Sequence, residues 1–320
     1  MRIPQPLPET LAFEPFTVHE ADAYGVSRGR LRHARIIRLS RSIKCVEALD
    51  LAEQQRLPPH RRYRAYTRVT LYSVASHRTA AEVWGFPLPP GNGAAQLHIL
   101  RPAGMAPQRR EGVCGHTGRL FSGEVCVVEG LALTSREKTW LDLAHRLSVD
   151  DLTVIADFLI RRPRPEHEDR TTPYATQDSL LAVIARHGGK RGIRKARLAL
   201  EMSRIGADSA QETRLRLALA EAGLPEPLVN EPIRGDDGGL HHQPDLTYPL
   251  YRVAVEYEGA GHSQTDQVES DIGREERIRA LGWTEVRISR RHMTGDARAA
   301  VNKVRAALIA GGWRAGPLAP

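Results

Sequence analysis

Three carboxylates and a histidine in the last third of the chain have the types and spacing of a metal-dependent site. They are Asp245, Glu256, Glu258 and His262, in the stretch QPDLTYPLYRVAVEYEGAGH. Two glutamates that are two residues apart on a strand project from one face, where they repel each other and lose hydration unless a cation lies between them. Mg²⁺ prefers oxygen ligands and can neutralise the charge that builds up when a phosphodiester is hydrolysed. The stretch therefore indicates a divalent metal and a phosphodiester.

A hairpin is needed to bring the two main ligands together. Asp245 and Glu256 meet if a strand at 243–246 pairs with a strand at 252–258 through the turn at 247–251. The backbone carbonyl of Tyr257 is then expected to face the same ion. The expected metal ligands are therefore Asp245, Glu256 and Tyr257, with Mg²⁺ or Mn²⁺ as cofactor.

Two further groups can support this centre. Glu212 can supply a third carboxylate from a preceding helix, although it also completes an S-x-x-E capping box with Ser209, which is an adequate structural role. His262 can act as a base or steady the leaving oxygen. The alternative is that a D…ExE pattern arises by chance at a solvent-exposed strand end.

The elements that carry these residues fill the last predicted domain, 206–315. Its order of helix, several strands, helix, strand and helix is typical of an α/β sandwich with a small mixed sheet. Val253 and Val255 are expected to face a helix, on the side of the strand opposite Glu256 and Glu258.

The first predicted domain, 1–75, has the spacing of a winged helix-turn-helix. Thr17 is expected to cap a short helix, Gly25 to form the turn and Ser27 to cap a second helix, followed by an alternating β wing. Basic residues crowd the second helix and could contact phosphates or guanine edges in DNA, at positions Arg28, Arg30, Arg32 and Arg35. The alternative is a solvated surface helix.

The middle predicted domain, 76–200, reads as α+β, with short strands around LHILRP and GEVCVVEGLALTS and helices after Ser135. Its histidines, His98, His116 and His145, are isolated in sequence, which favours structural or surface roles. RRPRPEHEDRTTPY is expected to be a loop or hinge. The basic stretch GGKRGIRKARLAL could rest on phosphates or form a solvated helix face, and both alternatives stay open.

Charge and composition set broad limits. The chain of 320 residues carries a net charge of +8, and residues 1–75 hold 13 Lys and Arg against 7 Asp and Glu, whereas residues 201–320 hold 15 against 18. A basic front suits a polyanion and an acidic rear suits a metal. The three cysteines are widely spaced, which indicates reduced thiols. No apolar run could span a membrane and no signal peptide begins the chain, so a cytoplasmic protein without a membrane partner is expected.

Several ordered pieces of the last domain resemble the PD-(D/E)xK nuclease superfamily. They are ETRLRLALAEAGLPEP, PDL, VAVEYEGAGH and ALGWTEVRIS. The branch they resemble is that of the very-short-patch-repair endonucleases, widespread as a domain of unknown function. The resemblance implies a restriction-endonuclease-like sandwich with Asp245 and Glu256 as metal ligands, Glu212 as an accessory carboxylate and His262 in the active site. One residue departs from the pattern, because Glu258 stands where the superfamily commonly has lysine.

The front and middle of the chain resemble the AbiEi-type antitoxin or regulator architecture, through the helix-turn-helix, SHRTAAEVWGFPLP and SREKTWLDLA. The sequence therefore predicts two alternative functions. One is a DNA-binding, Mg²⁺-dependent endonuclease. The other is a non-catalytic regulator or antitoxin with a degenerate nuclease fold, which implies a toxin partner. RNA as the target and a homodimer also stay open.

Overall fold

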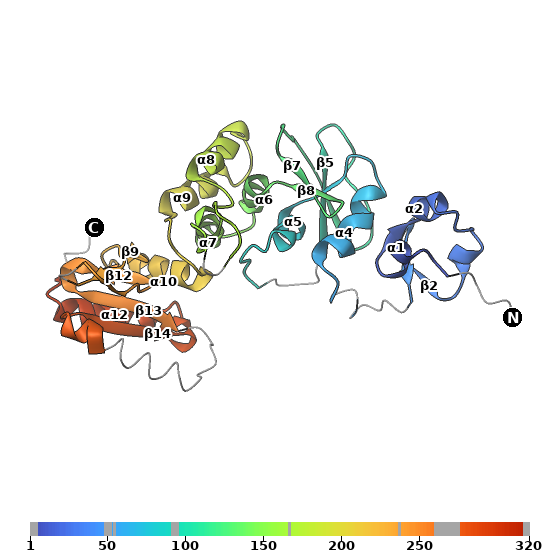
Figure 1. The fold of residues 1–320 in the computed structure, drawn as a ribbon. Coiled ribbons are helices and arrows are strands. Elements are labelled where there is room, and N and C mark those ends of the chain that lie inside the picture. Colours follow the sequence, from blue (N-terminus) through green and yellow to red (C-terminus); the bar gives the residue numbers. More distant parts are fainter. Residues whose placement is uncertain are drawn as a thin grey trace. The chain divides into compact units, whose positions relative to one another are not determined.

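The protein is described by a computed structural model that covers residues 6–47, 53, 56–90, 96–165, 168–235, 238–258 and 276–315. It is a mixed α/β protein with two compact units, one of residues 1–147 with 178–196 and one of residues 148–177 with 197–320 (Figure 1). The predicted middle segment, 76–200, therefore contributes residues to both units.

The first unit begins with a small antiparallel sheet in the order β1-β3-β2. Its elements are α1 (Glu9–Ala12), β1 (Phe16–Thr17), α2 (Val18–Ala23), η1 (Arg30–Arg32), β2 (Ile36–Ser40) and β3 (Ile43–Val46). Thr17 caps α2 as predicted, because its side chain accepts from the Glu20 N–H while the Glu20 carboxylate accepts from the Thr17 N–H. The alternating stretch predicted after this region forms the antiparallel strand pair β2–β3.

The predicted second helix of the helix-turn-helix is wrong. Ser27 does accept a hydrogen bond from the Arg30 N–H, but the helix that follows is the single 3₁₀ turn η1. Its only buried residue is Leu31, and His33 already has extended backbone angles. With one apolar anchor, a longer helix has no stripe of side chains to pack against the rest of the unit.

The rest of the first unit is built on a five-stranded mixed sheet in the order β6-β5-β4-β8-β7. Parallel pairing joins β5 to β6 and β4 to β8, and the other two pairs are antiparallel. The elements are α4 (Pro59–Arg68), β4 (Val74–Ala75), α5 (His77–Val83), β5 (Leu97–Pro102), β6 (Val113–Gly118), β7 (Val125–Val128), β8 (Leu131–Thr134), α6 (Arg136–Leu143) and α8 (Gln177–Arg186).

The second unit holds a four-stranded mixed sheet in the order β14-β13-β12-β9. β12 pairs antiparallel with β13, with Leu246 opposite Val255, and this confirms the predicted hairpin. β13 pairs in parallel with β14. The elements are α7 (Val149–Ile160), α9 (Ile193–Met202), which begins in the first unit, α10 (Ala210–Glu221), β9 (Leu228–Val229), β10 (Ile233–Arg234), β11 (Leu240–His242), β12 (Leu246–Tyr248), η2 (Pro249–Tyr251), β13 (Val253–Glu258), β14 (Thr284–Ser289), η3 (Arg290–Met293) and α12 (Arg298–Ala310).

The two faces of β13 pack against different partners. Val253 and Val255 share one buried cluster with leucines of α10 and with apolar residues of α12, so they face helices as predicted. Ala254 instead packs with Ile233 and Ile278. Because side chains alternate along a strand, Glu256 projects from the Ala254 face.

A buried carboxylate fastens α7 to α10. Asp157 is 1% exposed and accepts hydrogen bonds from the Arg204 N–H (2.7 Å), the Thr213 hydroxyl (3.0 Å) and Arg216 Nη2 (2.9 Å). The segment 148–177 is thereby tied to the unit that carries the carboxylates.

Two predictions on the whole chain can be checked. All three cysteines are free, as expected. Over the described ranges, no helix combines the length and apolar character that crossing a bilayer requires.

Candidate functional site

Asp245 lies where three strands of the second unit come together. It directly precedes β12, and its Oδ2 accepts a hydrogen bond from the Tyr257 N–H on β13 at 2.6 Å. Its backbone carbonyl accepts from the Asn230 N–H, just after β9, at 2.9 Å. The carboxylate is thus held against β13 at the end where Glu256 lies.

Glu212 approaches this point from the first turn of α10. The Ser209 side chain caps the helix by accepting from the Glu212 N–H at 3.2 Å, and Glu212 Oε2 accepts from the Asp208 N–H at 2.8 Å. Glu212 is 6% exposed. The residue therefore serves the helix start and still contributes a carboxylate to the site.

The electrostatics show that the carboxylates are close together. Burial, followed by the charges of Glu212 and Glu256, raises the pKa of Asp245 to about 8. The pKa of Glu212 is also raised, by burial first and then by the charge of Asp208. Four acidic groups therefore converge, and at neutral pH the Asp245 carboxyl holds a proton because burial and the charges of Glu212 and Glu256 disfavour its ionised form.

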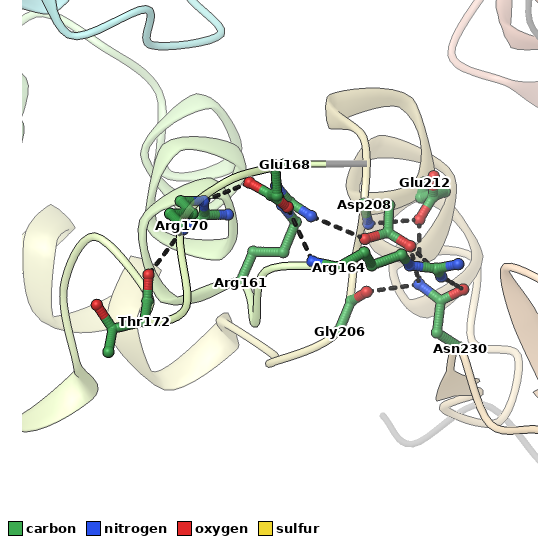
Figure 2. A network of polar contacts seen from close by, with 9 residues as sticks. All are labelled: Arg161, Arg164, Glu168, Arg170, Thr172, Gly206, Asp208, Glu212 and Asn230. Carbon is green, nitrogen blue, oxygen red and sulfur yellow. Dashed lines mark hydrogen bonds and ion pairs between the residues drawn. The ribbon is translucent and has the colours of Figure 1, made fainter. Parts of the chain in front are cut away.

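Cations are present nearby, but they pair with Asp208. Arg161 Nη1 lies 3.2 Å from Asp208 Oδ1, and Arg164 forms an ion pair with Oδ2 (Figure 2). Within the part of the chain that the structure describes, neither Glu212 nor Asp245 has a basic side chain at ion-pair distance. Glu212 and Asp245 are therefore the carboxyl groups of this cluster that lack a cationic partner among the described residues. Sequence analysis predicted Asp245 as a metal ligand and Glu212 as an accessory carboxylate.

Asn230 links these groups, and its role was not predicted. Its side-chain amide donates to the Gly206 carbonyl at 2.5 Å and lies 3.3 Å from Asp208 Oδ2 and 3.5 Å from Glu212 Oε2 (Figure 2). Its Oδ1 accepts from Arg164 Nη2 at 3.3 Å. Asn230 has a φ of +51°, a left-handed conformation that asparagine tolerates.

The two glutamates of β13 have different surroundings. Glu256 contacts the imidazole of His242, which comes from β11 and was not predicted. Glu258 is exposed, and its carboxylate lies 3.6 Å from Arg287 Nη1 on β14. His262 lies outside the described residues.

The predicted hinge at RRPRPEHEDRTTPY is held in place by ion pairs. Glu168 pairs with Arg161 at 2.5 Å and also with Arg170 (Figure 2). The Arg170 guanidinium lies over the Tyr174 ring, 4.1 Å from the ring centroid. Through Arg161 and Arg164, this segment is bonded to Asp208, one residue before the cap of α10. The segment therefore contacts the chain just before the start of α10, the helix that carries Glu212.

The arginines predicted to contact DNA remain at the surface of the first unit. Arg28, Arg32 and Arg35 are exposed and Arg30 is half-buried. Arg28 pairs with Asp22 at 2.7 Å. The 3₁₀ turn itself carries only Arg30 and Arg32, and Arg28 and Arg35 lie on either side of it.

The histidines of the first unit are not isolated, contrary to the sequence-based prediction. His77, His98 and His116 each offer a ring nitrogen, and these atoms all lie within 4.8 Å of one another. His98 Nδ1 is 2.9 Å from His116 Nε2, and the rings of His77 and His116 stack with centroids 3.9 Å apart. His145 meets His77 edge-on. The sheet assembles residues that are 18 to 39 positions apart, so their spacing carried no signal.

Part of the basic stretch 188–200 is already engaged inside the protein. Lys190 pairs with the buried Asp142 at 2.7 Å, and Lys195 donates to the Leu147 carbonyl at 2.8 Å. Neither lysine is therefore simply part of a solvated face.

Comparison with known proteins leaves the function open. No model of a known protein family matches the chain. Two relatives, from two strains of Mycobacterium tuberculosis and each described as an uncharacterized protein, are 28% identical over 218 residues, which cover 68% of this chain and 74% of each relative. Function is therefore inferred from the geometry of the sites.

Proposed function

We propose that the chain is a DNA-binding protein whose second unit hydrolyses phosphodiesters with a divalent metal ion. The observation that carries the proposal is the convergence of Glu212, Asp245 and Glu256 at a buried point: burial, followed by the charges of Glu212 and Glu256, raises the pKa of Asp245 to about 8. Burying like charges together is costly unless a cation is bound between them. The donor set fits Mg²⁺ or Mn²⁺, which take carboxylate and carbonyl oxygens.

The residues that would hold the ion are Asp245, Glu256 and the carbonyl of Tyr257. The Tyr257 N–H points to Asp245, and the N–H and C=O of one strand residue point to the same side of the strand, so the carbonyl faces the same edge. A bound ion supplies charge neutralisation and a water acidic enough to attack at neutral pH. Glu212 in the first turn of α10 and Asp208 just before the helix orient the site, and His242 positions Glu256 through their contact.

The architecture of the unit also supports the proposal. A mixed sheet with α10 and α12 on one face and Ile278 on the other is compatible with the restriction-endonuclease-like sandwich that the sequence resembles. DNA as the substrate is supported by the exposed arginines of the first unit and by the net charge of +8.

The test is cleavage of supercoiled plasmid DNA by the full chain with Mg²⁺ or Mn²⁺ and with EDTA. Asp245→Ala and Glu256→Ala should each abolish metal-dependent nicking, and Glu212→Gln should reduce it. The matched control is Glu221→Gln, which removes an exposed charge at the other end of α10 and should leave the rate unchanged. Nicking that persists in both alanine variants would refute the proposed site.

A second function is favoured by one observation. Glu258 stands at the position where the resembled superfamily commonly has lysine, and it pairs with Arg287. A non-catalytic regulator or antitoxin would use the first unit to bind an operator, with a toxin as partner. It predicts specific DNA binding that is retained in Asp245→Ala, together with Mg²⁺ binding and no cleavage by the wild-type chain.

A further inference from the structure

A second site lies in the first unit, at a pocket of about 570 Å³ with a strongly basic wall. Five of its lining side chains are cationic, namely Arg119, Lys138, Arg186, Lys190 and Arg191. No aspartate or glutamate lines it in the described part of the chain. The positive charge therefore faces the pocket without a matching charge inside it.

The floor of the pocket has an imbalance of buried charge. Asp142 is fully buried, and its Oδ1 pairs with both Lys138, at 2.5 Å, and Lys190, at 2.7 Å. Lys138 is itself only 1% exposed. Two ammonium groups share one carboxylate. Lys138 is buried, whereas the Lys190 side chain is 28% exposed and lines the pocket, so the unmatched positive charge faces the pocket and favours an anion there.

The other acidic group near the pocket is already engaged. Glu124 is 1% exposed, and its carboxylate lies 2.9 Å from His187 Nε2 and 4.0 Å from Arg186. Its charge also acts on Lys138, but its contacts are with His187 and Arg186, and it does not line the pocket.

The histidine cluster beside this floor has a donor set that zinc could use, but its surroundings favour an anion. Burial lowers the pKa of His77 to about 2 and those of His98 and His116 to about 4, so the rings are neutral at pH 7. A dication at the cluster would be close to Lys138 and Lys190 and within the field of the arginines, with Asp142 as its nearby counter-charge. Neutral imidazoles can instead donate N–H groups to an oxyanion.

We propose that this pocket binds the phosphate group of a phosphomonoester. Lys190 and Arg119 would bind the oxygens by charge-assisted hydrogen bonds, and His77 and His116 line the same space as neutral donors. Gly188 and Gly189, which precede Lys190, leave the backbone accessible to a close ligand. The same chemistry suits a terminal phosphate on a nucleic acid and a free nucleotide, and the site is distinct from the carboxylates of the second unit.

The test compares two single-stranded oligonucleotides of identical sequence, one with a 5′-phosphate and one with a 5′-hydroxyl, binding to the full chain in EDTA. Fluorescence anisotropy should show tighter binding of the phosphorylated strand. Arg28, Arg32 and Arg35 should contact the shared backbone of both oligonucleotides, so their contribution cancels in the ratio of the two dissociation constants. Adenosine monophosphate and inorganic phosphate serve as competitors. If the phosphorylated strand binds more tightly than adenosine monophosphate, the ligand is assigned as a nucleic-acid terminus. If the two bind with equal affinity, the ligand is assigned as a free nucleotide.

Two variants should remove the preference. Lys190→Met keeps the pair between Lys138 and Asp142, so the unit should fold, and it should weaken phosphate binding about 10- to 100-fold. Arg119→Ala removes an exposed side chain and should act in the same direction. Arg109→Ala is the matched control, because Arg109 is exposed in the same unit but does not line the pocket.

Two results would overturn the proposal. The first is that neither the phosphorylated strand, nor the mononucleotide, nor inorganic phosphate binds, or that their affinities are the same in Lys190→Met and Arg119→Ala as in Arg109→Ala. The other is stoichiometric zinc, measured by elemental analysis after reloading, that is lost in His98→Ala. His98 belongs to the cluster but does not line the pocket, so this variant separates a metal centre from a phosphate site.

Discussion

Replacing Asp245 with asparagine should stabilise the metal-free protein, although it destroys the proposed metal site. The pKa of Asp245 is raised from 3.8 to about 8, so between these values the folded protein holds a proton that the unfolded chain has released. The free energy of unfolding therefore falls as pH rises through this window. Asparagine has the same shape, carries no charge and can still accept from the Tyr257 N–H.

The size of the effect follows from the shift. Each pKa unit corresponds to about 1.4 kcal/mol, so Asp245 costs up to about 4 kcal/mol at pH 7 and about 1.7 kcal/mol at pH 5. Asp245→Asn should therefore raise the stability of the second unit by about 2.5 kcal/mol more at pH 7 than at pH 5. For a unit of this size, that difference corresponds to roughly 5 to 10 °C in Tm.

The measurement is differential scanning calorimetry of the full chain in EDTA at both pH values, with hydrogen exchange of peptides from β12 and β13 to assign the transition. Mg²⁺ should then stabilise the wild-type chain much more than Asp245→Asn, because the substitution removes the negative charge of one ligand. Glu221→Gln is the control for the loss of one exposed negative charge in the same unit.

Two outcomes would refute this reasoning. An Asp245→Asn protein that is less stable than wild type at pH 7 would mean that the carboxylate is stabilised by a partner that outweighs its repulsion. A gain that is equal at pH 5 and pH 7 would mean that Asp245 does not titrate in this window.

Three further changes test other parts of the structure. Asp157→Ala leaves the buried Arg216 without its partner on α7 and should lower the free energy of unfolding by about 3 to 5 kcal/mol in urea denaturation. Arg28→Ala combined with Arg32→Ala should weaken DNA binding and reduce the salt dependence measured by anisotropy by about two phosphate contacts. Glu258→Ala should reduce plasmid cleavage much less than Asp245→Ala, because its carboxylate is exposed and pairs with Arg287.

The sequence predicted the hairpin of the second unit for local reasons. Apolar residues alternate in 253–255, and the preceding turn contains Pro249, so the strands and their connection could be inferred from neighbours in the chain. The start of α10 was likewise predicted from Ser209 and Glu212, which are three residues apart.

The second helix of the predicted helix-turn-helix shows where such local inference fails. A cap at Ser27 and a run of basic residues are compatible with a helix, but a helix of ordinary length needs a stripe of side chains to bury. Only Leu31 is buried in this turn, and strand β2 follows soon after the single 3₁₀ turn. Packing decided the length of this element.

In the last third of the chain, the sequence predicted the hairpin, and that Asp245 and Glu256 would approach each other because this short hairpin joins them. It did not predict β11, and β12 begins three residues later than expected. Only the tertiary structure decided the charge around Asp245 and Glu256. It brings Asp208 and Glu212 near Asp245, and it places Glu258 beside Arg287. It also pairs Arg161 and Arg164 with Asp208. In the first unit it gathers three histidines into one cluster and pairs two lysines with Asp142. Charge and burial depend on contacts between residues far apart in the chain, and no local spacing encodes them.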